Sequence, residues 1–172
     1  MMQGYTHVYT GNGKGKTTAA LGLALRAAGA GLKVYFGQFI KSDEYNEIKA
    51  LTRFKDQITL AQYGRGCFIR GAPCEADIDM ARNGLRVLFD ALTSGAYDLV
   101  IADEANVAFG CGLITEADLL ALMDARPAAV ELVLTGRGAL PAVIAKADLV
   151  TEMVEIKHYY QQGVLARDGI EK

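Results

Sequence analysis

The chain has 172 residues and a formal net charge of −2, with 51% hydrophobic and 22% charged residues. This length and composition predict one globular domain, residues 1–172, with a hydrophobic core. The small net charge gives no general attraction to nucleic acid, and no apolar run approaches the roughly 18–20 residues that span a membrane. We therefore expect neither a nucleic-acid nor a membrane partner and, since no signal peptide is visible, a cytoplasmic location.

The first predicted elements are a strand at residues 4–9 and a helix at residues 17–28, separated by a glycine-rich segment. That segment, TGNGKGKTT, nearly matches the phosphate-binding loop G-x-x-x-x-G-K-[ST], with Thr10 in place of the first glycine. Glycines let successive backbone N–H groups converge on one anion, and the helix N-terminus adds partial positive charge. The sequence therefore predicts that a nucleoside triphosphate is bound by Gly11, Asn12, Gly13, Lys14, Gly15, Lys16, Thr17 and Thr18.

Two side chains of this motif have specific chemistry. Lys16 is placed to reach the outer phosphates, and the Thr17 hydroxyl is placed to bind Mg²⁺ or Mn²⁺. Arg26 lies further along the same predicted helix, and its position alone favours an ordinary surface residue.

The next elements continue the alternation of strands and helices. We expect a strand at 33–39, a helix at 44–54, a short strand at 58–61, a glycine-rich loop at 62–74 and a helix at 75–92. The last helix has an apolar stripe at helical spacing: Ile78, Ala81, Leu85, Leu88, Phe89 and Leu92. The cysteines are odd in number and form no CxxC pair, so we expect reduced side chains and no zinc site at Cys67, Cys74 and Cys111.

Residues 99–102 (LVIA) form a continuous apolar run, as expected for a strand buried on both faces of a parallel sheet. Ligands sit at the carboxyl ends of such strands, so Asp103 and Glu104 are candidates to hold the metal opposite Thr17. Which of the two acids does so stays open. In many ATPases the second carboxylate activates water, so Glu104 is equally a candidate for a hydrolytic base.

The remaining expected elements are a helix that starts with a capping box at residues 115–118, a strand at 130–134, a short helix at 141–147 and a strand at 149–156. Glycines and Arg137 follow the strand at 130–134, and the planar fork of Arg137 is a candidate phosphate ligand. For His158, in the tail, a surface position is favoured. Together with the loop, these elements predict an α/β fold of the P-loop NTPase-like (RecA-like) class, an open, mostly parallel sheet with helices on both faces.

Five motifs together resemble a known family. They are TGNGKGKTTAA (10–20), YDLVIADEAN (97–106), LTGRGA (134–139), ADLVTEM (147–153), and KH with a closing GIE (157–158 and 169–171). Their order along nearly the whole chain is similar to that of the ATP:corrinoid adenosyltransferases of the CobA/CobO/BtuR type.

The resemblance implies an enzyme that transfers the 5′-deoxyadenosyl group of ATP to Co(I) of a reduced corrinoid and releases triphosphate, in cobalamin biosynthesis or salvage. It implies a cytosolic homodimer that works with Mg²⁺, and a nucleotide that lies reversed in the loop. It also implies that Arg26 contacts the triphosphate, which makes Lys16, Glu104 and Arg26 the expected catalytic residues. These groups and the metal would stabilise charge on the leaving group, and no general base is needed because Co(I) carries no proton.

The loop at residues 62–74 stands where the family contacts the corrin ring. Better-known members carry a phenylalanine and a tryptophan there, whereas this chain has no tryptophan and offers Phe68 as the apolar contact. Such a contact would exclude an axial ligand and ease reduction of Co(II), with electrons from a reductant such as a reduced flavoprotein. The family's N-terminal extension is also missing, so the tail from His158 to Lys172 is one candidate to cover the ring.

Two other functions stay open. A P-loop ATPase or kinase would cleave the γ-phosphate with Glu104 as base, and would yield orthophosphate or ADP instead of triphosphate. A nucleotide-dependent regulator of corrinoid proteins would bind the corrin without forming a cobalt–carbon bond. The motifs downstream of the phosphate loop favour the adenosyltransferase.

Overall fold

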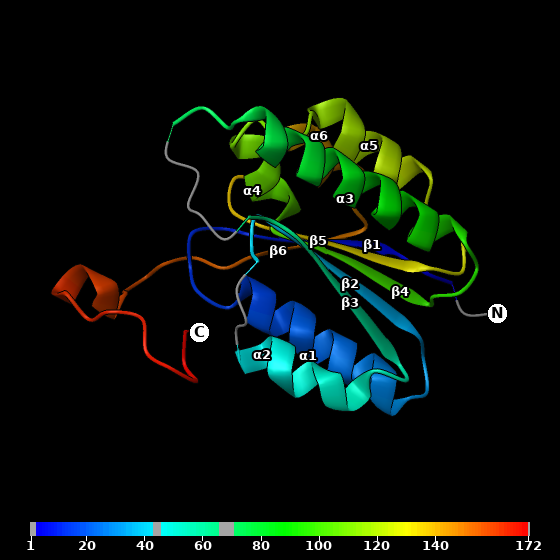
Figure 1. Cartoon of the computed structure of the whole chain (residues 1–172), viewed down its shortest axis with the longest axis horizontal. Coiled ribbons are helices and arrows are strands. Elements are labelled where there is room, and N and C mark those ends of the chain that lie inside the picture. The colour runs from blue at the N-terminus through cyan, green and yellow to red at the C-terminus, as the bar shows by residue number, and fades with distance from the viewer. Residues whose placement is uncertain (1–2, 43–45, 66–70, 172) are drawn as a thin grey trace.

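The computed structural model describes residues 3–42, 46–65 and 71–171 (Figure 1). Strands and helices alternate along these residues. The strands are β1 Thr6–Thr10, β2 Val34–Phe39, β3 Ile58–Tyr63, β4 Leu99–Asp103, β5 Glu131–Thr135 and β6 Leu149–Glu152. The helices are α1 Lys16–Gly29, α2 Asn46–Leu51, α3 Glu75–Thr93, α4 Ala105–Gly110, α5 Glu116–Asp124 and α6 Pro141–Lys146, with short 3-10 helices η1 Thr52–Phe54 and η2 Tyr159–Gln162.

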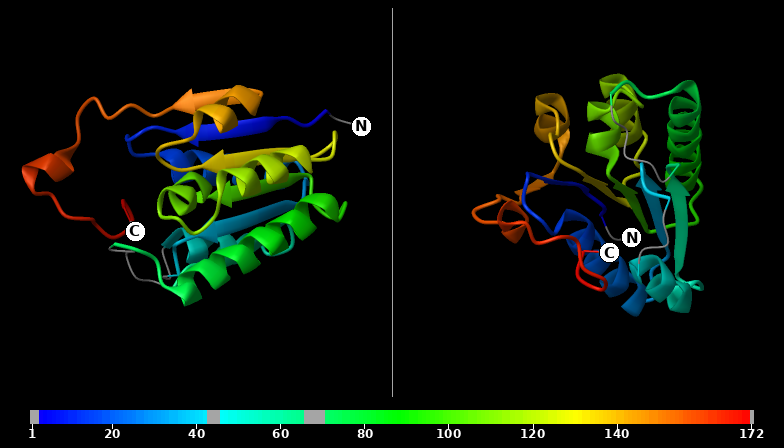
Figure 2. Two further views of the ribbon diagram at one scale, coloured as in Figure 1. Left: turned by 90° about the horizontal axis from the view of Figure 1, so that it is seen from above. Right: turned by 60° about the vertical axis from the view of Figure 1, so that its left-hand side comes forward.

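The strands form one open sheet in the order β3-β2-β4-β5-β1-β6, and every pair in it is parallel. Parallel neighbours need long crossovers, which the helices between the strands provide. All strands therefore end at the same edge of the sheet, as the arrowheads in Figure 2 show. The predicted α/β class is confirmed, and it is consistent with a P-loop NTPase-like fold.

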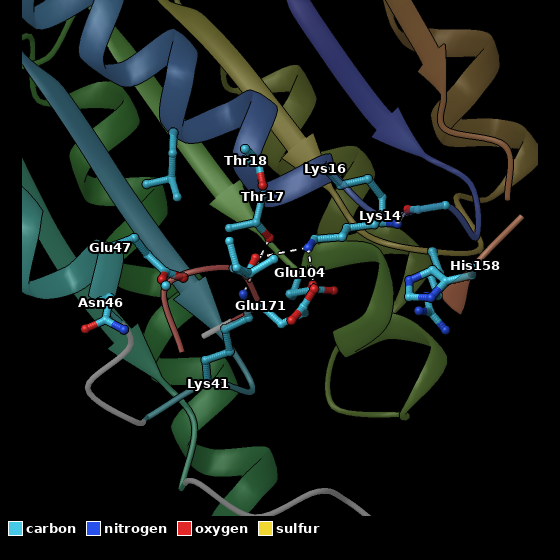
Figure 3. Close-up of a pocket in the computed structure, with 16 residues that line it drawn as sticks. Lys14, Lys16, Thr17, Thr18, Lys41, Asn46, Glu47, Glu104, His158 and Glu171 are labelled. Atoms are coloured by element: carbon cyan, nitrogen blue, oxygen red, sulfur yellow. Dashed lines mark hydrogen bonds and ion pairs between the residues drawn. The ribbon is translucent and has the colours of Figure 1, made fainter. Parts of the chain in front are cut away.

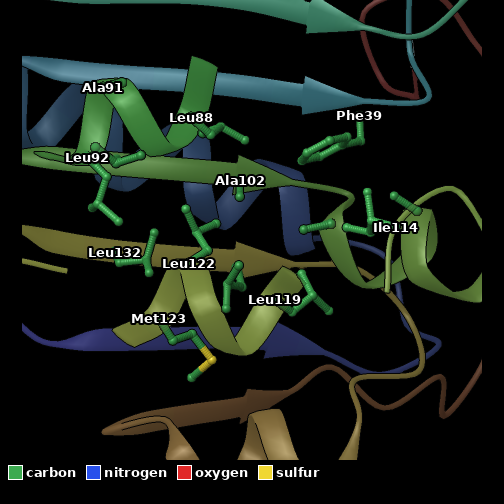
Figure 4. Packing of buried hydrophobic residues seen from close by; sticks show 14 of the residues in the cluster. Phe39, Leu88, Ala91, Leu92, Ala102, Ile114, Leu119, Leu122, Met123 and Leu132 are labelled. Atoms are coloured by element: carbon green, nitrogen blue, oxygen red, sulfur yellow. The ribbon is translucent and has the colours of Figure 1, made fainter. Parts of the chain in front are cut away.

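Helices cover both faces of this sheet: α1 and α2 lie on one side, and α3 to α6 lie on the other (Figure 1). On the second side, leucines of α3 and α5 pack together over the strands, among them Leu88, Leu92, Leu119 and Leu122 (Figure 4). On the first side, α1 presents small alanines to Phe36 and Ile101. Burial of a leucine or phenylalanine side chain contributes about 1.5–3 kcal/mol, so these two layers stabilise the sheet that positions the site.

Some sequence predictions were wrong, and strand pairing explains the two differences in strand length. β3 continues to Tyr63, because its ladder with β2 runs as far as the pair of Phe39 and Tyr63. β6 ends at Glu152 instead of residue 156, because its neighbour β1 ends at Thr10. The short helix α4 was not predicted. Phe89 is 38% exposed, so it is not part of the core that its helical spacing indicated.

The start of α5 confirms a local prediction. The capping box of α5 is present, since Asp118 N–H donates to Thr115 Oγ1 at 3.2 Å and Thr115 N–H donates to Asp118 Oδ2 at 2.8 Å. Cys74 and Cys111 are free, while Cys67 lies outside the described residues. Within the described part of the chain, none of the helices has the length and apolar character needed to cross a bilayer.

Candidate functional site

The glycine-rich loop between β1 and α1 needs glycine at two positions with positive φ. Gly11 has a φ of 92° and Gly15 a φ of 120°. A Cβ on Gly11 would also stand 2.4 Å from the carbonyl oxygen of Met153, so the loop passes directly against the segment after β6. Gly13 N–H donates to that same oxygen at 2.7 Å. The shape of the loop is therefore determined by its own glycines and by its contact with Met153.

Lys16, the first residue of α1, is only 7% exposed and lies under this loop. Its Nζ donates to Gly11 O at 2.8 Å and to Gly13 O at 2.7 Å. Burial lowers the pKa of Lys16, and the charge of Arg137 adds to the effect. A buried ammonium that has only neutral carbonyls as hydrogen-bond partners still attracts an anion, so Lys16 is ready to bind a phosphate group.

Asp103, at the end of β4, is fully buried and lies at the centre of a polar network. Thr17 Oγ1 and Thr135 Oγ1 donate to its Oδ1 at 3.0 Å and 2.7 Å. Gln38 Nε2 donates to Oδ2 at 3.0 Å, and Lys41 Nζ lies 3.6 Å from the same oxygen. These partners come from α1, from β5 and from the end of β2, so the order of the strands creates the network.

Glu104 follows in a left-handed conformation, with a φ of 59°, that turns the chain from β4 into α4. Its N–H donates to Thr135 Oγ1 at 2.9 Å. Burial, and next the charge of Asp103, raise the pKa of the Glu104 carboxyl. A non-glycine residue at positive φ is strained, and strained residues concentrate at functional sites. The turn at Glu104 is therefore a second sign of a site at this edge of the sheet.

The loop, the start of α1 and the ends of these strands line a pocket of about 520 Å³ (Figure 3). Its lining includes the cations Lys14, Lys16, Lys41 and Arg137. It also includes the carboxylates Glu47, Glu104 and Glu171, and His158 from the C-terminal segment. Cations gathered around a glycine-rich loop at a helix N-terminus favour a phosphorylated ligand.

Most residues predicted from the loop motif line this pocket: Gly13, Lys14, Gly15, Lys16, Thr17 and Thr18. Gly11 and Asn12 lie outside the lining, although Gly11 supplies a carbonyl to Lys16. Asp103 is not part of the lining, but it accepts a hydrogen bond from Thr17, which is. His158, for which a surface position was favoured, is half-buried and contributes to the lining of the pocket. Phe68 lies outside the described residues.

Arg26 is not brought to this pocket within one copy of the chain. It lies roughly 15 Å from Lys16 along α1, at the rise of about 1.5 Å per helical residue. Instead it lines a second cavity of about 350 Å³ together with Asp98 and Glu131, at the amino ends of β4 and β5. The first cavity therefore lies at the carboxyl ends of the strands, and the second lies at their amino ends.

Sequence reasoning missed several residues of the pocket, namely Lys41, Asn46, Glu47 and Glu171. The first three follow β2, and the rule that ligands sit at the carboxyl ends of parallel strands could have indicated them. Glu171 belongs to the closing GIE motif, but nothing in the sequence pattern shows that this end of the chain returns to the loop.

Thr17 and the two acids fit a Mg²⁺ ion. Thr17 Oγ1 lies 3.0 Å and 3.2 Å from the two carboxylate oxygens of Asp103, and Glu104 lines the pocket beside them. Mg²⁺ commonly takes one or two carboxylates and completes its shell with substrate phosphates and water. Among the residues that the structure describes, no group of three His, Cys, Asp or Glu side chains could hold a metal ion by itself. These oxygens therefore suit an ion that is shared with phosphate ligands.

A parallel α/β sheet with a glycine-rich loop, a buried lysine and an aspartate at the end of a central strand defines the class of P-loop NTPase-like proteins. Comparison with known proteins narrows this class. The chain matches the family described as ATP:corrinoid adenosyltransferase BtuR/CobO/CobP over residues 2–171, and it belongs to this family.

Curated relatives agree with this assignment. The chain is 37% identical over 170 residues to a corrinoid adenosyltransferase of Pseudomonas aeruginosa, covering 98% of this chain and 84% of the relative. It is 33% identical over 172 residues to the corrinoid adenosyltransferase CobA of Salmonella typhimurium, covering 98% of this chain and 86% of the relative. A corrinoid adenosyltransferase of Escherichia coli is 31% identical over 172 residues, with the same two coverages of 98% and 86%.

Proposed function

We propose that this chain is an enzyme that transfers the 5′-deoxyadenosyl group of ATP to the Co(I) centre of a reduced corrinoid and releases triphosphate. The cobalt–carbon bond forms as the bond between C5′ and oxygen breaks, and the triphosphate leaves with that electron pair. The observation that carries the proposal is the family match across residues 2–171. Relatives that match nearly the whole chain are named corrinoid adenosyltransferases.

The pocket suits a reaction in which negative charge collects on a triphosphate leaving group. Lys16 and Arg137 line it together with the glycine-rich loop. Preorganised donors and cations stabilise developing charge more strongly in a partly enclosed site than in bulk water. The attacking cobalt has no proton to lose, so the remaining task of the protein is to position the two reactants.

We assign the direct metal contacts to Thr17 and Glu104, with Asp103 holding Thr17 in place. Asp103 is fully buried and already accepts hydrogen bonds at both oxygens, whereas Glu104 lines the pocket. When bound, Mg²⁺ (or Mn²⁺) would supply positive charge to the phosphate oxygens. Reversal of the nucleotide in the loop, implied by the resemblance, would direct C5′ away from the loop.

The role expected for Arg26 depends on the expected homodimer. Within one copy, Arg26 lines the cavity at the far edge of the sheet, so a contact with the triphosphate would require a second copy of the chain. Both the dimer and this contact stay predictions.

The corrin site is also a prediction. Phe68, in the loop expected at 62–74, is proposed as the apolar contact that eases reduction of Co(II), and it lies outside the described residues. The reductant, such as a reduced flavoprotein, the cytoplasmic location and the single domain over residues 1–172 rest on the same sequence arguments.

One observation favours a second candidate, an ATPase or kinase that cleaves the γ-phosphate. Glu104 lines the pocket and has a raised pKa, as a general base often does. The phosphorus product separates the two functions. Incubation with ATP, Mg²⁺ and a chemically reduced corrinoid, followed by phosphorus NMR, should yield inorganic triphosphate that depends on the corrinoid. Orthophosphate or ADP formed with or without corrinoid would instead identify the second candidate.

A further inference from the structure

The C-terminal segment closes one side of the nucleotide pocket. We call residues 153–171 the C-terminal strap. At its start, Met153 O accepts a hydrogen bond from Gly13 N–H at 2.7 Å. Toward its end, Asp168 Oδ1 accepts one from Asn46 Nδ2 of α2 at 2.5 Å. The strap therefore contacts both the phosphate loop and α2, and its residues His158, Gly169, Ile170 and Glu171 line the pocket between them (Figure 3).

Lys14, in the middle of the phosphate loop, is fully engaged by this strap. Its Nζ lies 3.1 Å from Tyr159 Oη, 3.0 Å from Ile170 O and 2.8 Å from Glu171 Oε1. A lysine ammonium has three N–H donors, and these three acceptors use all of them. While the strap is docked, Lys14 has no donor left for a phosphate oxygen.

Glu171 is the residue on which these contacts converge. Besides Lys14, its carboxylate accepts from Arg167 N–H at 2.8 Å, from Arg167 Nε at 3.3 Å and from the Tyr159 hydroxyl. The Arg167 guanidinium lies 4.9 Å from the centre of the Tyr159 ring, which adds a cation–π contact. The carboxylate side chain is only 16% exposed, because these groups surround it. An anion is thus held on a phosphate-loop lysine.

We propose that Glu171 is an internal anion that occupies Lys14, and that a triphosphate group bound in the loop exchanges with it and releases the strap. This inference rests on the proposed function only in requiring that the loop binds a triphosphate. A triphosphate would bring several negative charges next to Glu171, and Glu47 and Glu104 already line the same pocket. These charges repel the carboxylate of Glu171. The triphosphate itself is retained, because it also contacts the buried Lys16, which Glu171 does not.

The exchange couples the arrival of the nucleotide to the position of the strap. Once Lys14 also releases Tyr159 Oη and Ile170 O, the described hydrogen bonds that still join the strap to α2 and the loop are those of Asp168 and Met153. The side of the pocket formed by Gly169, Ile170 and Glu171 would then open. Release of the strap can therefore be measured as a consequence of nucleotide binding, without any measurement of catalysis.

The test compares Glu171→Gln with the matched control Glu155→Gln. Glu155 is also in the strap, but its Oε1 accepts from Gln161 Nε2 and does not contact Lys14. Calorimetric titration with inorganic triphosphate and Mg²⁺ should show about two- to fivefold tighter binding for Glu171→Gln, the range typical of one lost surface ion pair. The control should bind as the wild type does.

Hydrogen exchange of the wild type provides a second measurement that does not depend on any variant folding. The amides of Gly163, Val164 and Ile170 donate hydrogen bonds within the strap. Their exchange in the wild type should become faster when inorganic triphosphate is added.

The outcomes separate the two proposals. Equal or weaker binding by Glu171→Gln, or a strap that becomes more protected with triphosphate, would overturn the exchange and would assign Glu171 to the wall of the occupied site. A wild type that binds neither ATP nor triphosphate would overturn the proposed function, and the exchange with it.

Discussion

Asp103 and Glu171 are two carboxylates beside the same phosphate loop, but they are held in opposite ways. Asp103 is fully buried at the end of β4 and accepts hydrogen bonds from α1, β2 and β5. Glu171 lies in a largely exposed C-terminal segment, and its carboxylate accepts hydrogen bonds from Lys14, Tyr159 and Arg167. The partners of Asp103 are separated from it only if the sheet opens, whereas Glu171 is separated from Lys14 by movement of one segment.

The comparison indicates which contacts build the site and which control access to it. A buried carboxylate with several partners leaves those partners unpaired when it is removed, at a large cost in stability. Ion pairs at the surface contribute little and are screened by salt. We therefore expect changes at the buried centre to abolish the site, and changes at the strap to adjust it.

Lys16→Ala should have the largest effect, complete loss of measurable ATP binding in calorimetry. Lys16 is the buried cation below the loop, and its removal also leaves Gly11 O and Gly13 O without their donor. Removal of one partner of a buried charge contact costs about 2–5 kcal/mol of binding free energy. Lys55→Ala, which changes an exposed lysine after η1, should bind normally. Retained ATP affinity in Lys16→Ala would show that this lysine does not bind the phosphates.

Asp103→Ala should lower the free energy of unfolding by about 3–5 kcal/mol in urea denaturation, because the donors of Thr17, Gln38 and Thr135 lose their acceptor. The matched change Asp79→Ala, at an exposed position on α3, should alter stability by less than about 0.5 kcal/mol. Equal stability of the two variants would show that the buried network does not hold the strand ends together.

Gly11→Ala should have an intermediate effect, about 1–3 kcal/mol of strain in the loop and roughly tenfold weaker ATP binding. Gly11 has a φ of 92°, and an added Cβ would stand 2.4 Å from Met153 O. Gly22→Ala is the control, since a Cβ there meets nothing within 4 Å. If Gly11→Ala binds ATP as tightly as the control does, the close contact between the loop and the segment after β6 is unimportant for the site.

Glu104→Gln should have the smallest effect on stability, and the size of this effect should depend on pH. Burial raises the pKa of Glu104, so the folded protein binds this proton more tightly than the unfolded chain does. Folding of the wild type then becomes less favourable as pH rises from the ordinary carboxyl range through the raised value. The variant lacks this penalty. Urea denaturation between about pH 4 and pH 8 should show that Glu104→Gln gains stability relative to the wild type as pH rises. If the difference in the free energy of unfolding between the two proteins stayed constant over this range, it would contradict the buried environment of Glu104.

Much of the buried centre could be predicted from the sequence, for physical reasons. The continuous apolar run at residues 99–102 indicated a central strand, so its end at Asp103 was predicted to lie at the carboxyl edge of the sheet. The loop motif likewise located Lys16 and Thr17, because it needs a strand before it and a helix after it. Long, strongly patterned elements determine these positions.

The contacts of the exposed parts could not be predicted in the same way. α4 has only six residues, too short for a helical period to stand out, and it starts from a strained Glu104. The strap has no hydrophobic period, and its path depends on single hydrogen bonds such as those of Lys14 and Met153. Arg26 also shows that a residue near the motif in sequence can lie far from the pocket, because a helix carries it along its length.

In the proposed reaction, the pocket holds the triphosphate of ATP while a corrinoid cobalt captures C5′. The most direct measurement is the visible spectrum of a dark, oxygen-free mixture of the protein, ATP, Mg²⁺ and a chemically reduced corrinoid. We expect a light-sensitive alkyl–cobalt spectrum that appears together with an equal amount of triphosphate and is absent with Lys16→Ala. Consumption of ATP to orthophosphate with no cobalt–carbon bond would contradict it.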